Sequence, residues 1–285
     1  MHNITKIAAV VVLYNPDLGV IENLNSYIDQ IDKLYAVDNS ENINSIVVEK
    51  IKCIKKAEYI SNGKNLGIAA ALNIGAKKAI KEGFEFLLTM DQDSRATPGM
   101  ILKLSGVASS SLLNGIAAAR HVNIEFPMET ENKVTEEVLY TITSGNLLNL
   151  AAYQKVGPFM EELFIDHVDH EYCLRMKKNG FRVLKINHAV VYHKIGNAAR
   201  KKFLVWFLYT SGHSPLRLYY RTRNRFYVDS IYKKLFPEYV KEDRRNLVKE
   251  LLGIFLLEKD LWSKIRMIFK GYRDFKQNIL GKYQF

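Results

Sequence analysis

The sequence predicts an α/β protein whose largely parallel sheet is followed by a basic helical extension. Two observations carry this prediction. Short apolar runs alternate with helical patterns through the first half of the 285 residues, an order typical of β-α-β units. Positive charge is concentrated in the last third of the chain, where apolar residues recur at helical spacing.

Each expected element rests on its own pattern. Four short apolar runs predict strands at residues 7–14, 34–38, 57–61 and 84–90. The first run is too continuously apolar for a half-exposed strand, which indicates a buried position in a parallel sheet. Residues 67–83 predict a helix with a face of small residues, ended by Gly83. Residues 164–180 predict another helix, and residues 183–196 predict a strand that runs into a loop.

The net charge of the chain changes from slightly negative to strongly positive near residue 200. Residues 194–285 hold 21 Lys and Arg against 8 Asp and Glu, a net +13, which leaves 20 against 22, or −2, for residues 1–193. We therefore expect a catalytic domain over residues 1–200 and a basic helical extension over residues 201–285. Such asymmetry is typical of proteins with an anionic partner. The two cysteines lack metal-binding spacing and favour a reducing cytoplasm.

Polar residues follow each of the four predicted strands. The segments, in order, are YNPD, DNS, NGKNLG and DQDS. Turn residues are common at such places, but four segments on one edge favour a ligand site, because open α/β sheets bind ligands outside the carboxyl ends of their strands. Neither G-x-G-x-x-G nor a P-loop motif follows the first strand, which argues against a dinucleotide site and a P-loop site.

Asp91 and Asp93 stand one residue apart after the fourth strand, so their carboxylates would repel each other. A divalent cation between them removes this repulsion and leaves coordination positions open for a diphosphate. Adjacent positions of this kind point apart on a strand, so we expect the chain to turn here, at the strand-breaking residues Ser94 to Pro98. The alternative is a solvated acidic loop.

The helix predicted at residues 164–180 carries a second acidic cluster. An apolar stripe at helical spacing runs along this helix, and Asp169 lies beside it, so we expect Asp169 to be half-buried. A carboxylate held in this way is suited to act as a general base. His193, in the loop that follows, is a candidate ligand of a metal or a diphosphate, although a lone histidine is more often structural.

Eight segments in this order resemble glycosyltransferase family 2, whose members have the GT-A fold, and most of all its bacterial rhamnosyltransferases. They span roughly residues 7 to 230 and are VVLYNPD, AVDNS, NLGIAAALNIGA, TMDQDS, TSGNLLN, VGPFMEELFIDHVDHEYCLRMKKNG, VYHKIG and LRLYYRTRNRFY. The resemblance implies a mostly parallel, Rossmann-like nucleotide-binding sheet flanked by helices. It also implies an inverting glycosyltransferase that uses Mg²⁺ or Mn²⁺.

The resemblance assigns roles to the matching positions. The nucleotide would be bound by Tyr14, Asn15, Asp38, Asn65, Gly67 and Asp91. The metal would be held by Asp91, Asp93 and His193. Asp169 falls where the family has its catalytic base, and Val168 replaces the glutamate that is often its neighbour. Contacts to the sugar, the acceptor or the diphosphate would come from Ser144, Gly145, Arg221, Arg223 and Asn224.

These roles imply a single displacement. Asp169 would deprotonate an acceptor hydroxyl, which attacks the anomeric carbon from the face opposite the leaving nucleoside diphosphate. The metal and an arginine would offset the charge on that leaving group. The resemblance favours dTDP-L-rhamnose as the donor and a glycan or polyprenyl-linked glycan as the acceptor, in the synthesis of a cell-surface polysaccharide.

Residues 246–277 predict an amphipathic helix with Leu, Ile, Phe and Trp on one face and Lys and Arg on another. Such a helix can pack on the catalytic domain or form the interface of a homodimer. It can also lie on an anionic membrane surface, and these interpretations are compatible with one another. We accordingly expect a cytoplasmic protein that binds peripherally to the inner face of the cell membrane.

Two other classes of protein compete with this interpretation. A nucleic-acid-binding protein would use the segment RLYYRTRNRFY, with arginines and aromatic residues on a strand platform, but it leaves Asp91, Asp93 and Asp169 without a role. A nucleotidyltransferase also uses paired aspartates and a metal, but it needs a triphosphate-binding loop rich in Gly, Arg and Lys where YNPDLGV stands. We therefore expect no nucleic-acid partner.

Overall fold

The computed structural model describes residues 5–122, 133–193, 199–203, 206–210 and 212–284. The chain divides into two units, which we call the sheet unit and the helical unit. The sheet unit comprises Met1–Glu161 and Tyr172–Lys194, and the helical unit comprises Glu162–Glu171 and Ile195–Phe285. The predicted division at residue 200 assigns the short segment Glu162–Glu171 to the catalytic domain, whereas in the structure this segment belongs with the carboxyl-terminal helices.

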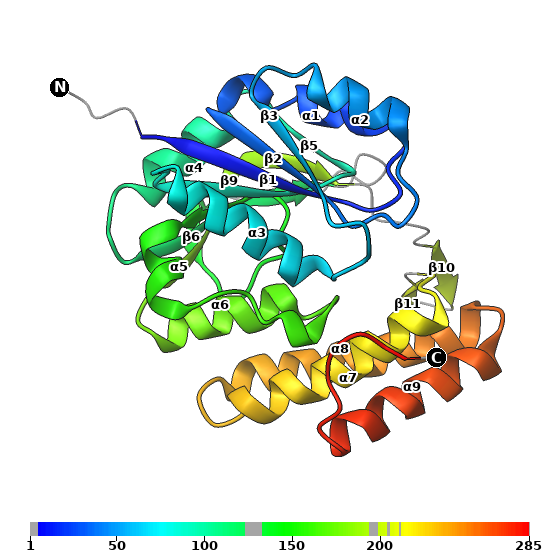
Figure 1. The fold of residues 1–285 in the computed structure, drawn as a ribbon. Helices are drawn as coiled ribbons and strands as arrows, with labels where there is room; N and C mark the ends of the chain where they lie inside the picture. The colour runs from blue at the N-terminus through cyan, green and yellow to red at the C-terminus, as the bar shows by residue number, and fades with distance from the viewer. Residues whose placement is uncertain (1–4, 123–132, 194–198, 204–205, 211, 285) are drawn as a thin grey trace. The chain divides into compact units, whose positions relative to one another are not determined.

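The sheet unit is built on one mixed sheet, which has nine strands within the described residues (Figure 1). The strands are β1 (Ile7–Leu13), β2 (Lys33–Asp38), β3 (Ala57–Ser61), β4 (Phe86–Asp91), β5 (Ser94–Ala96), β6 (Asn114–Val122), β7 (Thr135–Glu137), β8 (Asn146–Asn149) and β9 (Arg182–His193). Their order is β3-β2-β1-β4-β8-β6-β9-β5, and β7 pairs with β9.

The first four strands are parallel, as predicted. β1 lies between β2 and β4, with Val11 opposite Ala36 on one side and Met90 on the other. Beyond β4 the antiparallel strand β8 enters, and β6 and β9 then run parallel to each other. The predicted strands at residues 7–14, 34–38, 57–61 and 84–90 are therefore confirmed, with small shifts of their ends.

Helices cover both faces of this sheet. Those of the sheet unit are α1 (Gly19–Asn25), α2 (Ser45–Lys52), α3 (Ile68–Lys81), α4 (Met100–Ala108) and α5 (Leu150–Val156), with the short 3-10 helix η1 (Ile28–Gln30). Two further elements, the 3-10 helix η2 (Glu161–Leu163) and α6 (Val168–Lys178), contain residues of both units. Successive side chains of β1 point to opposite faces. Ala9 and Val11 join a core with α1, α2 and α4, whereas Val10 meets α3, which crosses the other face (cyan in Figure 1).

The turn at the end of β4 differs from the predicted one. The residues Ser94–Ala96 form the short strand β5, which pairs with the end of β9. The turn itself consists of Gln92 and Asp93, between the two strands. The predicted break at Ser94 to Pro98 is therefore wrong by two residues, because pairing with β9 satisfies the backbone there and keeps it extended.

Besides the segment Glu162–Glu171, the described part of the helical unit contains a pair of short antiparallel strands and three long helices. They are β10 (Ala199–Phe203), β11 (Trp206–Thr210), α7 (Pro215–Tyr232), α8 (Pro237–Leu257) and α9 (Leu261–Lys276). Ser214 caps α7 by accepting the backbone N–H of Arg217 at 3.3 Å. Gly271 lets α9 pack closely on α7, because a Cβ there would lie 2.5 Å from the carbonyl oxygen of Tyr219.

The single amphipathic helix predicted over residues 246–277 is wrong, since this stretch contains the end of α8 and the whole of α9. Asp260, immediately before α9, has a left-handed backbone with φ 57°. Lys264 forms an ion pair with Glu258 across the break. None of the helices that the structure describes has the length and the apolar character that crossing a bilayer requires.

The contact between α3 and β1 generates a prediction about Gly75. A Cβ at Gly75 would lie 2.5 Å from Cγ2 of Val10, a fully buried residue of a central strand. We expect Gly75→Ala to lower the free energy of unfolding by about 1–2 kcal/mol, because overpacking outweighs the gain in helix propensity. Urea unfolding followed by circular dichroism measures this.

Gly106 supplies the matched control. It lies in α4 with no atom within 4 Å of a Cβ built there, so Gly106→Ala is expected to leave stability unchanged or to raise it by up to about 1 kcal/mol. Equal unfolding midpoints for the two variants would contradict the close packing of α3 on β1.

Candidate active site

The polar segments after the parallel strands meet along one edge of the sheet unit, as predicted. The backbone N–H of Tyr14 donates to Oε1 of Gln92 at 2.9 Å, which joins the loops after β1 and β4. The backbone N–H of Asn15 donates to Oγ of Ser40 at 2.7 Å, which joins the loops after β1 and β2. Asn15 has a left-handed backbone with φ 46°. We call this edge the polar rim.

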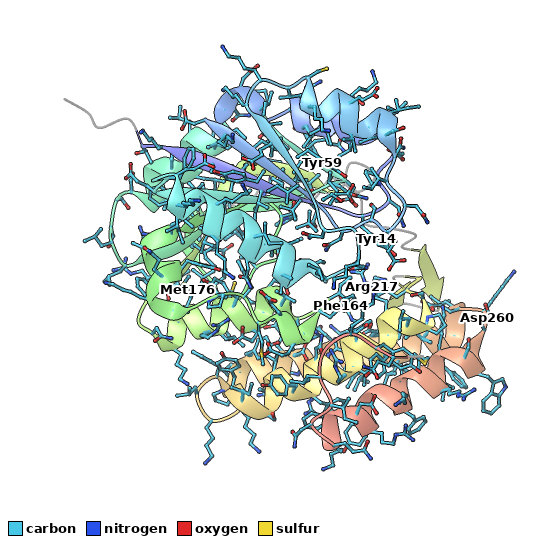
Figure 2. All side chains as sticks on the ribbon, viewed as in Figure 1. Tyr14, Tyr59, Phe164, Met176, Arg217 and Asp260 are labelled. Atoms are coloured by element: carbon cyan, nitrogen blue, oxygen red, sulfur yellow. The ribbon has the colours of Figure 1, made fainter. Side chains whose placement is uncertain are left out.

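Asp38 lies at the end of β2 with a side chain that is almost fully buried. Its carboxylate accepts hydrogen bonds from the backbone N–H of Ser40 at 2.8 Å and from the hydroxyl of Tyr59 at 2.7 Å. Tyr59 is on the neighbouring strand β3 and is labelled in Figure 2. Burial, followed by the hydrogen bond to Asp38, raises the pKa of Tyr59 above its ordinary range, so its hydroxyl remains a donor that holds the carboxylate in place.

Asn65 and Gly67 stand at the amino end of α3. Gly67 has φ 88°, a conformation that few other residues adopt, and its backbone N–H donates to Oδ1 of Asn65 at 2.9 Å. The side chain of Asn39 donates to the carbonyl of Gly67 at 2.9 Å. The loop after β3 and the start of α3 are thereby tied to the end of β2 at the polar rim.

Asp91 ends β4, and Asp93 lies in the turn between β4 and β5. Asp91 is half-buried and Asp93 is exposed. The backbone N–H of Asp91 donates to Oγ of Ser144 at 3.1 Å, and this fully buried hydroxyl donates to Oγ of Ser94 at 2.8 Å. Ser144 thus holds both sides of the turn, from the end of β4 to the start of β5.

Gly145 follows Ser144 and has φ 76°. Its N–H donates to the carbonyl of Thr89 in β4 at 2.8 Å, and a Cβ there would lie 3.0 Å from Val191. Both the backbone conformation and the space therefore require glycine. The structure brings Asp91, Asp93, Ser144 and Gly145 together at the polar rim.

His193 ends β9. Its backbone pairs with that of Ser94, the residue that follows Asp93. The fold therefore brings this position beside the paired aspartates, while its side chain lies outside the described part of the structure. Its role as a metal ligand stays a prediction.

In the helical unit, residues 162–167 form a loop that leads into α6, which we call the entry loop. Phe164, Asp166 and His167 all have left-handed backbones, with φ of 65°, 62° and 62°. Each such residue is costly, and the cost is greatest for a bulky side chain such as Phe. A loop with this conformation must be held by contacts outside its own sequence.

Asn224 of α7 provides the main contact. Its buried side-chain amide donates to the carbonyls of Leu163, Ile165 and Asp166, at 2.8, 2.8 and 2.9 Å. Arg223, also fully buried, donates to the carbonyls of Glu162 and Leu163 at 3.3 and 3.2 Å and to that of Gly281 at 2.7 Å.

Aromatic and ionic contacts complete the hold on the entry loop. The ring of Phe164 stacks on that of Tyr220, with 5.0 Å between centroids. Nε of Arg217 lies 3.2 Å from Oδ2 of Asp166, and Figure 2 labels both Phe164 and Arg217. Burial alone would raise the pKa of Asp166, but Arg217 and Arg221 outweigh it and lower the pKa of this carboxyl. The carboxylate therefore stays ionised.

Asp169 lies in the first turn of α6 and is half-buried, as expected. Its Oδ1 accepts the backbone N–H of His170 at 2.9 Å, and no ion pair between described side chains includes it. Burial raises the pKa of Asp169, which makes its carboxylate a stronger base than an exposed one. This is the environment that a proton acceptor requires.

The three α7 residues predicted to contact sugar, acceptor or diphosphate have different surroundings. Arg223 and Asn224 use their side chains on backbone carbonyls of the helical unit. Arg221 is about one third exposed and forms an ion pair with Glu250 at 2.7 Å. The segment RLYYRTRNRFY is helical and its Arg223 and Arg225 are buried, so it does not form the strand platform that a nucleic-acid-binding protein would need.

Sequence reasoning missed several residues that build the site. Gln92, Ser94 and Tyr59 position the predicted residues, but each is of a type that occurs at any turn or strand. The left-handed conformation of the entry loop was not predicted, because nothing in the amino-acid sequence around Phe164 indicates a positive φ there. Asn224 was found by resemblance, but its hydrogen bonds to three carbonyls could not be read from the sequence.

These features define the protein class. The chain belongs to glycosyltransferase family 2, whose family model matches residues 8–153, and it is a glycosyltransferase of GT-A fold. It is 32% identical over 240 residues to the dTDP-rhamnosyl transferase RfbF of Shigella flexneri, which covers 78% of this chain and 79% of that protein. The predicted α/β class with the GT-A fold and the resemblance to rhamnosyltransferases are thereby confirmed.

Solved structures share the fold at low sequence identity. GalNAc-T7 with UDP, GalNAc and Mn²⁺ superposes with a TM-score of 0.63 at 14% identity, over 98% of this chain and 57% of that one. This chain thus spans little more than half the length of GalNAc-T7. TarS 1–349 from S. aureus, in complex with UDP-GlcNAc, gives 0.62 at 17% identity, over 96% of this chain and 82% of that one.

The hold on the entry loop generates a prediction. In Asn224→Asp the shape is kept, but the two N–H donors are replaced by a carboxylate facing three carbonyl oxygens. We expect the free energy of unfolding to fall by about 3 kcal/mol, because three buried hydrogen bonds are replaced by repulsion between carboxylate and carbonyl oxygens, and only Nε of Arg223, which donates to Oδ1 at 2.9 Å, remains as a partner. Urea unfolding measures the loss.

Asn179→Asp is the control, because Asn179 is exposed after α6 and donates to one carbonyl only. A loss below about 1 kcal/mol is expected there. If both variants lose the same amount, Asn224 does not hold the entry loop.

Proposed function

We propose that this protein is an inverting, metal-dependent rhamnosyltransferase. It transfers L-rhamnose from dTDP-L-rhamnose to a hydroxyl of a glycan or lipid-linked glycan during synthesis of a cell-surface polysaccharide. The observation that carries the proposal is the turn at Asp91 and Asp93 on the polar rim, in a chain similar along most of its length to a dTDP-rhamnosyl transferase.

The donor atoms at the turn fit a divalent cation. Asp91 and Asp93 offer carboxylate oxygens, the ligand type that Mg²⁺ and Mn²⁺ prefer. Asp93 is exposed, which leaves coordination positions for phosphate oxygens and water. A cation held there, by these two and in the proposal by His193, supplies charge that stabilises the departing diphosphate. The solved relative with UDP and Mn²⁺ supports this assignment.

The polar rim suits the nucleotide part of the donor. In the proposal Tyr14 and Asn15 line its pocket and the carboxylate of Asp38, held by Tyr59 and Ser40, contacts the base. Asn65 and Gly67 place the amino end of α3 at the rim, where a helix favours negative charge such as phosphate.

Asp169 is the proposed base. Its Oδ1 is fixed by the N–H of His170, and burial strengthens it as a proton acceptor. It takes the proton of the acceptor hydroxyl as that oxygen bonds to the anomeric carbon and the bond to the diphosphate breaks. A single displacement of this kind inverts the configuration. Ser144 and Gly145 are proposed for the sugar and acceptor region, and Arg221 for the diphosphate, because its guanidinium is partly exposed.

The reaction is tested with the purified full-length chain, Mg²⁺ or Mn²⁺, and a panel of nucleotide sugars, following release of the nucleoside diphosphate. We expect metal-dependent release from dTDP-L-rhamnose in preference to UDP-glucose, UDP-GlcNAc and GDP-mannose. Asp93→Ala and Asp169→Asn should each lower the rate by about 10²- to 10⁴-fold. Asp29→Ala, an exposed aspartate in η1, should not.

Release from another donor would keep the mechanism and overturn the rhamnosyl assignment. If no donor reacts, binding of dTDP in the presence of Mg²⁺ is measured by calorimetry. Metal-dependent binding that Asp93→Ala abolishes would support the proposed donor site and would indicate that the reaction needs an acceptor that was absent. No binding of any nucleotide would overturn the proposed function.

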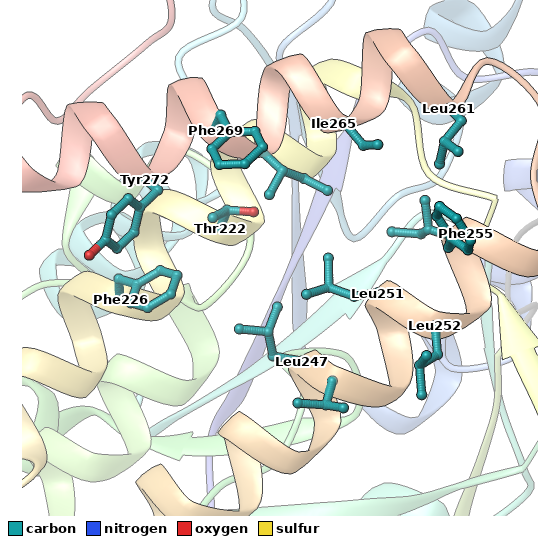
Figure 3. A pocket seen from close by; sticks show the side chains of 13 residues that line it. Thr222, Phe226, Leu247, Leu251, Leu252, Phe255, Leu261, Ile265, Phe269 and Tyr272 are labelled. Carbon is teal, nitrogen blue, oxygen red and sulfur yellow. The ribbon is translucent and has the colours of Figure 1, made fainter.

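We also propose that the helical unit docks on an anionic membrane surface at the inner face of the cell membrane, where a lipid-linked acceptor would lie. An apolar groove of about 550 Å³ runs between α8 and α9 (Figure 3). Phe255 and Phe269 line it with exposed fractions of 64% and 69%, and the nearby Trp262 is 85% exposed. Arg266, Lys270 and Arg273 are grouped with Trp262 and Phe269 around an adjoining hollow.

Aromatic side chains beside basic ones match the interface of an anionic bilayer, and each basic residue near such a surface contributes about 1 kcal/mol. The full-length chain is therefore expected to sediment with vesicles that contain anionic lipid and to be released at high salt. Trp262→Glu with Phe269→Glu should abolish sedimentation. Leu112→Glu, which changes an 87% exposed leucine of the sheet unit, should not.

Sedimentation of the double variant at the wild-type level would overturn the membrane proposal. A change from dimer to monomer in the double variant, without vesicle binding by the wild type, would assign this surface to a homodimer instead.

A further inference from the structure

Three metal-ligating side chains of the helical unit form a cluster that shares no residue with the proposed donor site. Among the described residues, His167, His170 and Asp243 each offer a ligand atom, and these atoms all lie within 4.8 Å of one another. His167 ends the entry loop, His170 lies in the first turn of α6, and Asp243 comes from α8. None of the three was singled out by the sequence motifs.

His167 has an unsatisfied nitrogen inside this cluster. Its side chain is 4% exposed, and Nε2 is buried with no hydrogen-bond partner. Oδ1 of Asp243 lies 3.7 Å away, too far for a hydrogen bond. A buried polar atom without a hydrogen-bond partner is uncommon in folded proteins, and a bound ion is one arrangement that satisfies such an atom.

The other two side chains are oriented by outer partners. Nδ1 of His170 lies 2.9 Å from the hydroxyl of Tyr239, a fully buried residue of α8. Oδ2 of Asp243 accepts from Nε of Arg225 at 2.8 Å. Arg225 also donates to Glu250 at 2.9 Å, so its charge is divided between two carboxylates. Partners of this kind orient the ligands in known metal sites.

We propose that His167, His170 and Asp243 bind a divalent transition-metal ion, with Zn²⁺ as the best match. Two imidazoles and one carboxylate suit Zn²⁺, whereas Mg²⁺ prefers oxygen ligands alone. Three protein ligands leave a fourth position for water. The side chains would close in slightly by rotation, since a bound cation brings its ligand atoms nearer to one another than they are here.

The ion would tie the entry loop to α8. It would add a direct bond at His167, one of the three left-handed residues, and at His170, whose N–H holds Asp169. The site is inferred from these side chains alone and does not rest on the proposed transfer reaction. A proton on His167 that pairs with Asp243 is the competing arrangement, and the experiment separates the two.

The experiment measures zinc retention by the full-length chain. The protein is stripped with a chelator and equilibrated with Zn²⁺ in a large excess of Mg²⁺, which is added to compete for the proposed site at Asp91 and Asp93. It is then analysed for bound metal. We expect one Zn²⁺ per chain and a higher melting temperature with Zn²⁺. His170→Gln and Asp243→Asn should each weaken zinc binding by at least about 10-fold.

His188→Gln is the matched control, because His188 is exposed on β9 and outside the cluster. It should retain zinc as the wild type does. If a cluster variant fails to fold, X-ray absorption of the zinc-loaded wild type replaces it, with two imidazole neighbours expected around the metal.

No zinc retained by the folded wild type, or retention unchanged in folded His170→Gln and Asp243→Asn, would overturn the site and leave the His167–Asp243 ion pair. Failure of donor turnover would leave the result intact, since the readout is bound metal rather than activity.

Discussion

The conformation of the entry loop depends first on one amide group. The side chain of Asn224 donates to three carbonyls of the entry loop, where three residues have left-handed backbones. Such conformations cost roughly 1–3 kcal/mol each, and a typical hydrogen bond contributes only about 1 kcal/mol. The loop therefore needs the amide, the buried guanidinium of Arg223 and the stacked ring of Phe164 together. The orientation of Asp169, two residues beyond the loop, follows from that hold.

At the polar rim, the acidic residues are positioned mainly by backbone pairing within the sheet rather than by side-chain contacts. Asp91 precedes a two-residue turn that contains Asp93, and the strand that follows the turn pairs with β9, so the sheet itself defines where the turn falls. The buried hydroxyl of Ser144 contacts both β4 and β5. Here the backbone ladder provides the rigidity, whereas in the helical unit side chains provide it. Rigid supports of both kinds are what a site needs to hold charge in place.

Much of the sheet was predictable because its strands have strong local signals. Continuous apolar runs such as that of β1 leave few alternatives to a buried parallel strand, and polar residues at their ends mark the ligand edge. Features set by tertiary contacts were not predictable. β5 forms only because β9 lies beside it, and the left-handed backbone of Phe164 persists only because α7 holds the loop. Arg223 was expected to contact phosphate, but the N–H donors of its guanidinium can also bind backbone carbonyls, and the sequence does not distinguish these two kinds of acceptor.

The chain passes between its two units three times, after Glu161, after Glu171 and after Lys194. A gene truncated after Lys194 would encode the ten residues Glu162–Glu171 without the α7 side chains that hold them. The carboxyl-terminal helices are thus not an interchangeable module. Recombination could not exchange them cleanly for another protein's extension, and new specificity in this region would have to arise residue by residue.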